Sequence, residues 1–318
     1  MNSVTEVNQA ALEQAEPILS KAKIRSRVMA LLDAGYTVTR LATETGLTRN
    51  DIKAWQKWDA SDDVDAVLGR WLGEIEQAAR ESEPGWFDAP TAMGWLSGFQ
   101  HAQSEPSIFI GASAAGCSKT TSKFYYAEHV ARGSVLHISA SPAVKTFTAV
   151  LDMLLRELNG YGNVADSYRK MTMIDAVVRE MRGRSLIIID ESQHLDYEAL
   201  EGMRIFLDDY QIGLAFLGNE KTYKDFSGTG QAARFAQLSS RVGRRLMVLK
   251  PDEGDIDAML AAWGVKGRRE REFMQLVGML PGALRNVHKV IKTARELGGT
   301  ELVHLKSAAK YIGLGVQS

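Results

Sequence analysis

The spacing of apolar residues changes along this chain and separates a helical N-terminal segment from a segment of alternating strands and helices. Residues 25–58 read RSRVMALLDAGYTVTRLATETGLTRNDIKAWQKW, with apolar side chains mostly three or four positions apart. That period places apolar side chains on one face of a helix, and the TETGLT interruption is typical of a turn. The pattern therefore predicts a helix, a turn and a second helix.

Small and apolar residues around this turn indicate how the two helices cross. Counting from Val38, alanine is fifth (Ala42), glycine is ninth (Gly46) and isoleucine is fifteenth (Ile52). A small residue lets two helices approach closely, glycine permits a positive φ in the turn, and Ile52 packs the second helix inward. This spacing resembles that of DNA-binding helix-turn-helix proteins.

The outer face of the second helix carries polar residues that would meet phosphates and base edges. The predicted DNA-binding residues on this helix are Arg49, Asn50, Lys53 and Lys57. Two other interpretations remain open: a small helical bundle with a solvated charged face, and a module that binds protein.

From about Ser107 onward, short and fully apolar runs alternate with helical stretches. Five runs are predicted strands: SIFIGA, SVLHISA, SLIIID, IGLAFLG and RLMVLK. Strands that are apolar on both sides suit a parallel sheet covered by helices, so this segment is predicted to have an α/β fold. Beyond Pro251 the strands stop, and a helical period with glycine and proline interruptions predicts a small helical lid.

Composition narrows the class of protein. A chain of 318 residues with 45% apolar side chains is long enough for two or three packed units. No apolar run approaches the roughly 18 residues needed to cross a bilayer. The single Cys117 excludes an internal disulfide framework. We expect a cytoplasmic protein without zinc.

Charge is distributed unevenly, although the formal net charge is −1. Residues 21–59 contain eight basic and four acidic residues, whereas residues 61–84 contain seven acidic and two basic ones. A second basic stretch spans residues 219–250, and Lys145 follows a predicted strand. Lys145 is therefore a further predicted DNA-binding residue.

The turn after the first predicted strand nearly matches a phosphate-binding loop. In the pattern G-x-x-x-x-G-K-[ST], backbone N–H groups surround phosphates at a helix N-terminus, the lysine reaches the β- and γ-phosphates, and the hydroxyl residue helps to hold magnesium. In SAAGCSKT, Ser113 and Ser118 replace the two glycines. The predicted ATP-binding residues are Ser113, Gly116, Cys117, Ser118, Lys119, Thr120 and Thr121, with Thr120 also a magnesium ligand.

Ser118 leaves two outcomes open. Its Cβ either crowds the phosphates and forces a strained backbone angle, or lies at a negative φ where serine costs little. A short strand-to-helix turn without a ligand is the simpler alternative for the whole loop.

Two acids follow the third predicted strand in LIIIDESQHL. Open α/β sheets bind ligands at the carboxyl ends of their strands, where Asp190 and Glu191 would lie. Asp190 is the predicted magnesium ligand, and Glu191 is predicted to accept a proton from an attacking water. His194 is predicted to be a structural neighbour.

Further polar residues follow in the chain. Asn219 ends a predicted strand, where it would orient a water near a γ-phosphate. Arg241, Arg244 and Arg245 precede the apolar residues of the last predicted strand, and Arg285, the last residue of PGALR, begins a lid helix. Arginine suits these places because its permanent charge neutralises charge that develops on phosphate.

Together, these motifs resemble the AAA+ ATPases of DNA transposition, and most closely the MuB family of target-capture proteins from Mu-like phages. The resemblance implies an AAA+ P-loop NTPase with a five-stranded parallel sheet, a C-terminal helical lid and an N-terminal all-α helix-turn-helix domain. The expected segments are a DNA-binding domain over 1–80, a linker and leading helix over 81–105, a nucleotide-binding domain over 106–250 and a lid over 251–318.

The same resemblance implies roles for single residues. Asn219 would be the first sensor of the nucleotide and Arg285 the second, and Arg241 would reach a neighbouring subunit's nucleotide, with Arg244 and Arg245 as rivals. It also implies ATP and Mg²⁺ as cofactors, and double-stranded DNA with little sequence preference, a transposase and further copies of this chain as partners. Family members assemble as filaments on DNA, and hydrolysis controls disassembly and target immunity.

Two other hypotheses remain open. Ser113 and Ser118 favour a DNA-binding protein that binds ATP without hydrolysing it. The motifs of the α/β segment are also compatible with an AAA+ regulator outside transposition.

Overall fold

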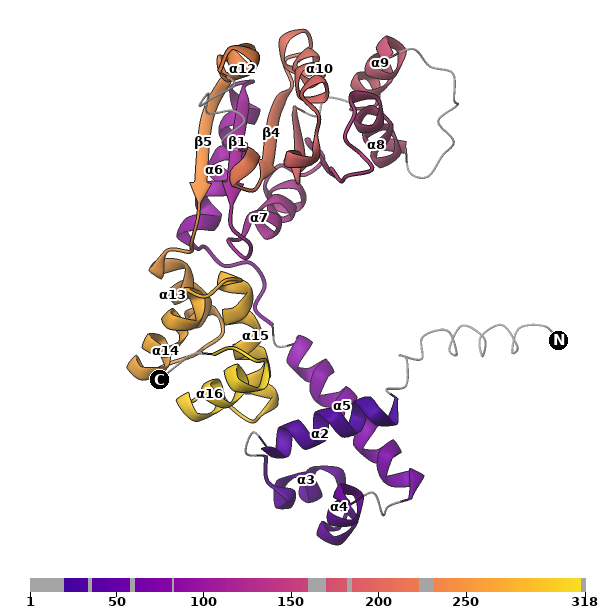
Figure 1. The fold of residues 1–318 in the computed structure, drawn as a ribbon, viewed down its shortest axis with the longest axis vertical. Coiled ribbons are helices and arrows are strands. Elements are labelled where there is room, and N and C mark those ends of the chain that lie inside the picture. Colours follow the sequence, from indigo (N-terminus) through magenta and orange to yellow (C-terminus); the bar gives the residue numbers. More distant parts are fainter. Residues whose placement is uncertain are drawn as a thin grey trace, which may run out of the picture. The chain divides into compact units, whose positions relative to one another are not determined.

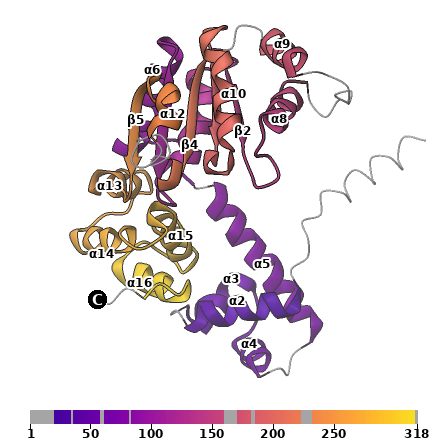
Figure 2. The same ribbon diagram turned by 45° about the horizontal axis from the view of Figure 1, so that its top comes forward.

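A computed structural model describes residues 20–33, 36–57, 61–81, 83–159, 170–181, 185–222 and 232–315. The chain divides into two compact units. The first takes in Met1–Gly85, Trp263–Phe273 and His288–Ser318, and the second takes in Trp86–Ala262 and Met274–Val287. Figure 1 and Figure 2 show the elements of both units from two directions.

The second unit is built on a five-stranded parallel sheet in the order β2-β3-β4-β1-β5. Its strands are β1 (Ile108–Ser113), β2 (Val135–Ser139), β3 (Leu186–Asp190), β4 (Gly213–Gly218) and β5 (Val242–Val248). All five predicted strands are confirmed. Because the strands are parallel, their carboxyl ends lie along one edge, and the turns after β1, β3 and β4 are neighbours there.

Helices cover both faces of this sheet because successive strand residues point to opposite sides. Ile110, Ile189 and Phe216 pack toward α8 (Phe147–Asn159), α9 (Lys170–Met181) and α10 (Tyr197–Asp208). Phe109, Ile188 and Leu217 pack toward α6 (Pro90–Ser104), whose Trp95 and Phe99 are fully buried. The result is a three-layer α/β/α unit, with α7 (Lys119–Tyr125) following the predicted phosphate loop.

The last strand begins earlier than the apolar pattern predicts. It starts at Val242, so Arg244 and Arg245 lie within β5 and not before it as expected. An edge strand tolerates charged side chains because one of its sides is unpaired. The Arg244 guanidinium donates to the Ser97 hydroxyl on α6 at 2.7 Å. The helix α12 (Ala232–Ser239) precedes this strand.

The N-terminal helices of the first unit are α2 (Lys21–Asp33), α3 (Val38–Thr45), α4 (Arg49–Gln56) and α5 (Asp62–Glu81). The helix α3 ends at Gly46, whose φ of 73° confirms the predicted glycine turn. A capping box between Thr48 and Asp51 starts α4, and Ile52 is fully buried. The helix α5 includes the acidic residues that follow Trp71 and ends at Glu81.

The C-terminal segment is helical, with α13 (Glu253–Ala262), α14 (Arg268–Gly278), α15 (Ala283–Glu296) and α16 (Leu302–Tyr311). The division between the units passes through α14 and α15, so residues 251–318 contribute to both units. Within the second unit, the buried Asp255 carboxylate accepts the Thr91 N–H at 2.7 Å and thereby binds α13 to the first turn of α6. Among the described residues, no helix is long and apolar enough to cross a membrane.

Candidate functional site

The predicted phosphate loop connects β1 to α7 at the carboxyl edge of the sheet. Ser113 ends β1 and is buried, and its hydroxyl has no hydrogen-bond partner within the described part of the chain. Cys117 is also buried, and its carbonyl accepts the Trp95 indole N–H at 3.0 Å. Burial, aided by the charge of Asp255, raises the pKa of the Cys117 thiol to about 11, so this thiol is protonated at neutral pH.

Ser118 lies in the left-handed region, with φ 57° and ψ 3°. This decides between the two outcomes that the sequence leaves open: the backbone has the conformation that glycine normally supplies, and serine bears the strain. Lys119 follows as the first residue of α7, and Thr120 and Thr121 are exposed in its first turn. Position 118 thus has the left-handed backbone that glycine would favour, and the predicted phosphate loop leads directly into α7.

Replacing Ser118 with glycine is expected to stabilise the protein by about 1 kcal/mol, because the left-handed conformation no longer carries a Cβ. Thermal unfolding without ligand measures this. Gln211 is a matched control, because it is exposed and also has a φ of 54° outside the loop. Gln211→Gly should give a similar gain. A loss of stability in Ser118→Gly would contradict the strained assignment.

The loop contacts the turn before α15 directly. The Leu284 N–H donates to the Gly116 carbonyl at 3.2 Å. Gly116 has a φ of 84°, and a Cβ added to it would lie 2.1 Å from the Gly282 carbonyl oxygen. Ala283 also has a positive φ, 46°. The close approach therefore depends on glycine at position 116 and places the PGALR segment against the phosphate loop.

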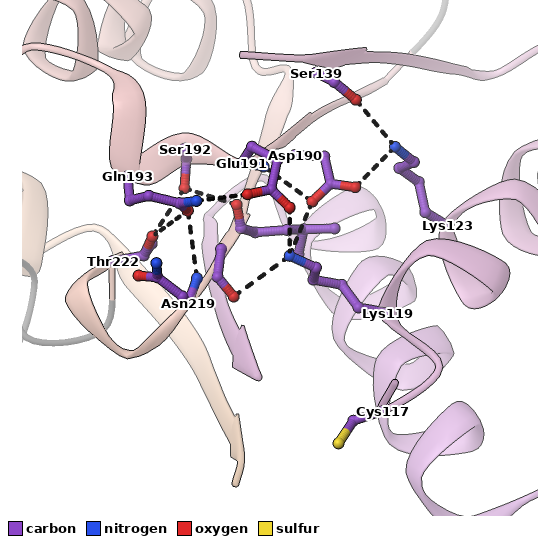
Figure 3. A network of polar contacts seen from close by, with 12 residues as sticks. Cys117, Lys119, Lys123, Ser139, Asp190, Glu191, Ser192, Gln193, Asn219 and Thr222 are labelled. Atoms are coloured by element: carbon purple, nitrogen blue, oxygen red, sulfur yellow. Dashed lines mark hydrogen bonds and ion pairs between the residues drawn. The ribbon is translucent and has the colours of Figure 1, made fainter. Parts of the chain in front are cut away.

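Lysines and carboxylates meet beside the loop, as Figure 3 shows. The Lys119 ammonium lies 3.1 Å from Asp190 Oδ1 and 3.3 Å from Glu191 Oε1. The Lys123 ammonium lies 3.0 Å from Asp190 Oδ2. Burial alone would raise the pKa of Asp190, but the charges of Lys119 and Lys123 outweigh this and hold it below its usual value.

Glu191 begins a turn of 3-10 helix, η2 (Ser192–His194), and has a φ of 54°. Its side chain is 47% exposed. The Gln193 amide donates to Glu191 Oε2 at 2.5 Å, and its oxygen accepts the Asn219 N–H at 3.3 Å. Gln193 thus connects the two predicted catalytic residues that follow β3 and β4 (Figure 3).

Asn219 lies directly after β4, where the sequence predicts it, and is exposed. Its side-chain oxygen accepts the Lys221 N–H at 2.9 Å. The Lys119 ammonium lies 3.5 Å from the neighbouring Gly218 carbonyl. Asn219 therefore lies at the edge of the sheet that the Lys119 ammonium reaches. Its side-chain oxygen is already hydrogen-bonded within the turn after β4. His194 is partly buried, and its N–H donates to the Glu191 carbonyl at 3.1 Å.

The arginines are placed differently from one another. Arg285 is exposed one residue after Leu284, beside the phosphate loop. Arg241 precedes β5 at the amino edge of the sheet, opposite the loop. Its guanidinium pairs with Asp208 through Nε–Oδ1 at 2.6 Å and Nη2–Oδ2 at 2.8 Å. Within one chain, the structure brings Arg285 near the candidate site and does not bring Arg241 there.

The five predicted DNA-binding residues are divided between the two units. Arg49, Asn50, Lys53 and Lys57 are exposed along and just after α4 in the first unit. Lys145 is exposed in the second unit between β2 and α8. All five side chains are therefore accessible.

Two residues of the site were missed by sequence reasoning. Lys123 stands four residues after Lys119, and a helical period places both on one face of α7. Gln193 stands two residues after Glu191 in the acidic motif. Both spacings were visible in the sequence, but neither residue belongs to the loop pattern.

These features fit a nucleotide with a divalent metal. The loop N-terminal to α7 offers backbone donors, Lys119 offers a cation for phosphate, and Ser113 offers a buried hydroxyl without a partner among the described residues. The Asp190 carboxylate is a hard oxygen ligand of the kind that Mg²⁺ prefers. The residues present therefore suit both groups.

Two family models match this chain. The C-terminal model of the Mu B transposition protein matches residues 240–310, and a model of an AAA domain matches residues 103–224. The fold is shared with a Cdc6 protein from Pyrobaculum aerophilum, with a TM-score of 0.52 and 14% identity over 74% of this chain and 71% of that one. It is also shared with an ORC2 protein from Aeropyrum pernix, with a TM-score of 0.50 and 16% identity over 75% and 68%.

Curated relatives extend over most of the chain. The ATP-dependent target DNA activator B of Escherichia phage Mu is 29% identical over 81% of this chain and 83% of its own length. The protein of the same description from Escherichia phage D108 is 28% identical over the same shares. A Mu-like prophage DNA transposition protein B from Haemophilus influenzae is 28% identical over 80% of this chain and 90% of its own length.

Proposed function

We propose that this homologue of the Mu B transposition proteins is an ATPase that assembles on target DNA in the ATP-bound state and activates a transposase there. One observation carries the proposal: Lys119, Asp190 and Glu191 converge at the carboxyl edge of an AAA-type sheet. The names of the relatives, which are ATP-dependent target DNA activators, support the choice of reaction and partner.

In this proposal, the chain's own residues divide the work of hydrolysis. Lys119 leaves the two carboxylates and contacts the β- and γ-phosphates, while Ser113 and the loop N–H groups hold the phosphates in place. Glu191, released from Lys119, accepts a proton from the attacking water, and Gln193 keeps its carboxylate beside Asn219. When bound, Mg²⁺ neutralises phosphate charge, with Asp190 and Thr120 as its protein ligands.

Arg241 is proposed to act on a neighbouring subunit. It lies at the sheet edge opposite its own phosphate loop, so it contributes to a site only if a second copy packs against that edge. Such an arrangement makes assembly depend on ATP, because one subunit completes the site of the next. The Asp208 ion pair would then have to open before Arg241 reaches a phosphate. Release of this assembly by hydrolysis would account for target immunity.

DNA binding is proposed to involve the exposed face of α4 and Lys145. Sequence-tolerant binding rests on phosphate contacts, so the affinity should fall steeply with salt. We expect Arg49→Ala, Lys53→Ala and Lys57→Ala each to reduce the slope of log K against log salt by about 1 if that residue contacts one phosphate. Fluorescence anisotropy of labelled duplex DNA, with ATP and Mg²⁺ present, measures the slope.

Arg268→Ala is the matched control, because this guanidinium is 91% exposed on α14 and pairs with Glu272. It should leave the slope unchanged. Equal slopes in the wild type and all three α4 variants would exclude phosphate contacts from this helix and favour the alternative that it binds protein.

A second candidate is a DNA-binding protein that binds ATP without turnover. The left-handed Ser118 favours it, because the strained serine stands where the loop must approach the phosphates. The two candidates differ in one measurement, since only the first predicts phosphate release that requires Glu191.

A further inference from the structure

Lys123 is a buried cation that the phosphate-loop pattern does not contain. It lies on α7, one turn beyond Lys119, and its side chain is 3% exposed, compared with 13% for Lys119. A lysine is almost never buried this deeply without a partner, because removing an ammonium ion from water is costly. The position therefore requires a counter-ion.

Asp190 is that counter-ion. Its side chain is 5% exposed, and its Oδ2 lies 3.0 Å from the Lys123 ammonium. The second polar neighbour is the Ser139 hydroxyl at 3.5 Å, at the end of β2, where Ser139 is in register with Asp190 on β3. Lys123 thus lies across the ends of two adjacent strands, as Figure 3 shows.

The two Asp190 oxygens have different surroundings. Oδ1 accepts the Glu191 N–H at 2.9 Å and faces Lys119, which is partly exposed and must move if it is to contact phosphate. Oδ2 faces Lys123, whose side chain is buried at 3% exposure. A nucleotide can therefore displace Lys119 from Asp190 but leaves Lys123 in place.

We propose that Lys123 is a positioning residue that permanently neutralises Asp190 and holds its Oδ2, so that only Oδ1 is released toward the metal when ATP binds. This inference rests on the proposed function for its link to ATP and Mg²⁺. Its consequence is a site that holds Mg²⁺ less tightly than an unpaired aspartate would, because Lys123 reduces the negative charge that faces the metal.

The first test measures nucleotide affinity against Mg²⁺ concentration, using a fluorescent non-hydrolysable ATP analogue. Mg²⁺ is expected to raise the affinity for the analogue, and the half-concentration is the Mg²⁺ concentration that gives half of this increase. In Lys123→Met the half-concentration should fall about tenfold, because a positive charge close to the metal site is removed. Lys123→Arg keeps the charge and should remain within about threefold of the wild type. An unchanged or higher half-concentration in Lys123→Met overturns the proposal. Lys266→Met, at an exposed lysine in the first unit, is the control for loss of charge.

The second test needs no nucleotide, so it stays informative if ATP binding itself fails. Thermal unfolding is compared among Lys123→Met, Asp190→Asn and the double variant. If the two residues are a buried pair, the double variant should unfold several degrees above Asp190→Asn alone, because the unpaired buried ammonium is gone. Additive effects would show that Lys123 only packs and would overturn the proposal. If the protein does not bind ATP but the effects of the two substitutions on unfolding are non-additive, the proposed function is refuted and the buried pair is retained.

Discussion

Glu191→Gln is expected to slow ATP hydrolysis by about 10²–10⁴-fold while leaving the fold and the affinity for ATP nearly unchanged. The amide cannot accept the proton of an attacking water, but it keeps the size of the side chain and an oxygen for the Gln193 amide. The side chain is 47% exposed, so water solvates the new amide and the substitution leaves no buried polar group without a partner. Phosphate release and a nucleotide titration measure the two effects separately.

Glu220→Gln is the matched control, because Glu220 is exposed one residue after Asn219 and receives no role in the mechanism. It should hydrolyse ATP at the wild-type rate. Equal turnover in Glu191→Gln and the wild type would remove Glu191 from the reaction. A wild-type protein that binds ATP and releases no phosphate would support the non-hydrolysing alternative.

Asp190→Asn, one residue earlier, is expected to lower stability in addition to removing a proposed Mg²⁺ ligand. It leaves the buried Lys123 ammonium without a counter-ion, and breaking a buried ion pair in this way costs about 3–5 kcal/mol. For a protein of this size, the loss corresponds to a fall in the unfolding temperature of roughly 5–8 °C. Thermal unfolding without nucleotide measures it, with Glu191→Gln as the comparison.

The pH dependence has the same origin. Lys119 and Lys123 outweigh burial and hold the pKa of Asp190 below its usual value, so its contribution to stability is complete at neutral pH. That contribution is lost as the pH falls from about 4, the pKa of an unfolded aspartate, through the lower folded value. Asp190→Asn should remove this part of the acid sensitivity. If Asp190→Asn is no less stable than Glu191→Gln, the Lys123–Asp190 ion pair does not stabilise the fold by the several kcal/mol expected of a buried pair.

The positions of the strands, and of Asp190, Glu191 and Asn219 at their carboxyl ends, could be predicted from the sequence. Each central strand is apolar on both sides, which is diagnostic of a covered parallel sheet, and a polar residue after such a run must lie at the sheet's carboxyl edge. The sequence therefore predicts that the turns after β1, β3 and β4 lie at one edge of the sheet, and the strand order of the structure makes them neighbours there.

Other features depended on contacts between segments that are distant in the chain. Nothing in the pattern of α7 marks Lys123 as buried, because its partner Asp190 ends a strand 67 residues later in the chain. The start of β5 at Val242 depends on its place at the sheet edge, where Arg244 and Arg245 are tolerated. The contact between Gly116 and Leu284 joins two turns that the sequence treats as separate motifs.

We propose that ATP bound at Lys119 controls assembly on DNA. Sedimentation of the protein with duplex DNA, compared with and without ATP and Mg²⁺ for the wild type and Lys119→Ala, tests it most directly. We expect large protein–DNA assemblies for the wild type only when ATP is present, and none for Lys119→Ala under either condition. Assemblies of equal size without nucleotide, or in Lys119→Ala with ATP, would contradict it.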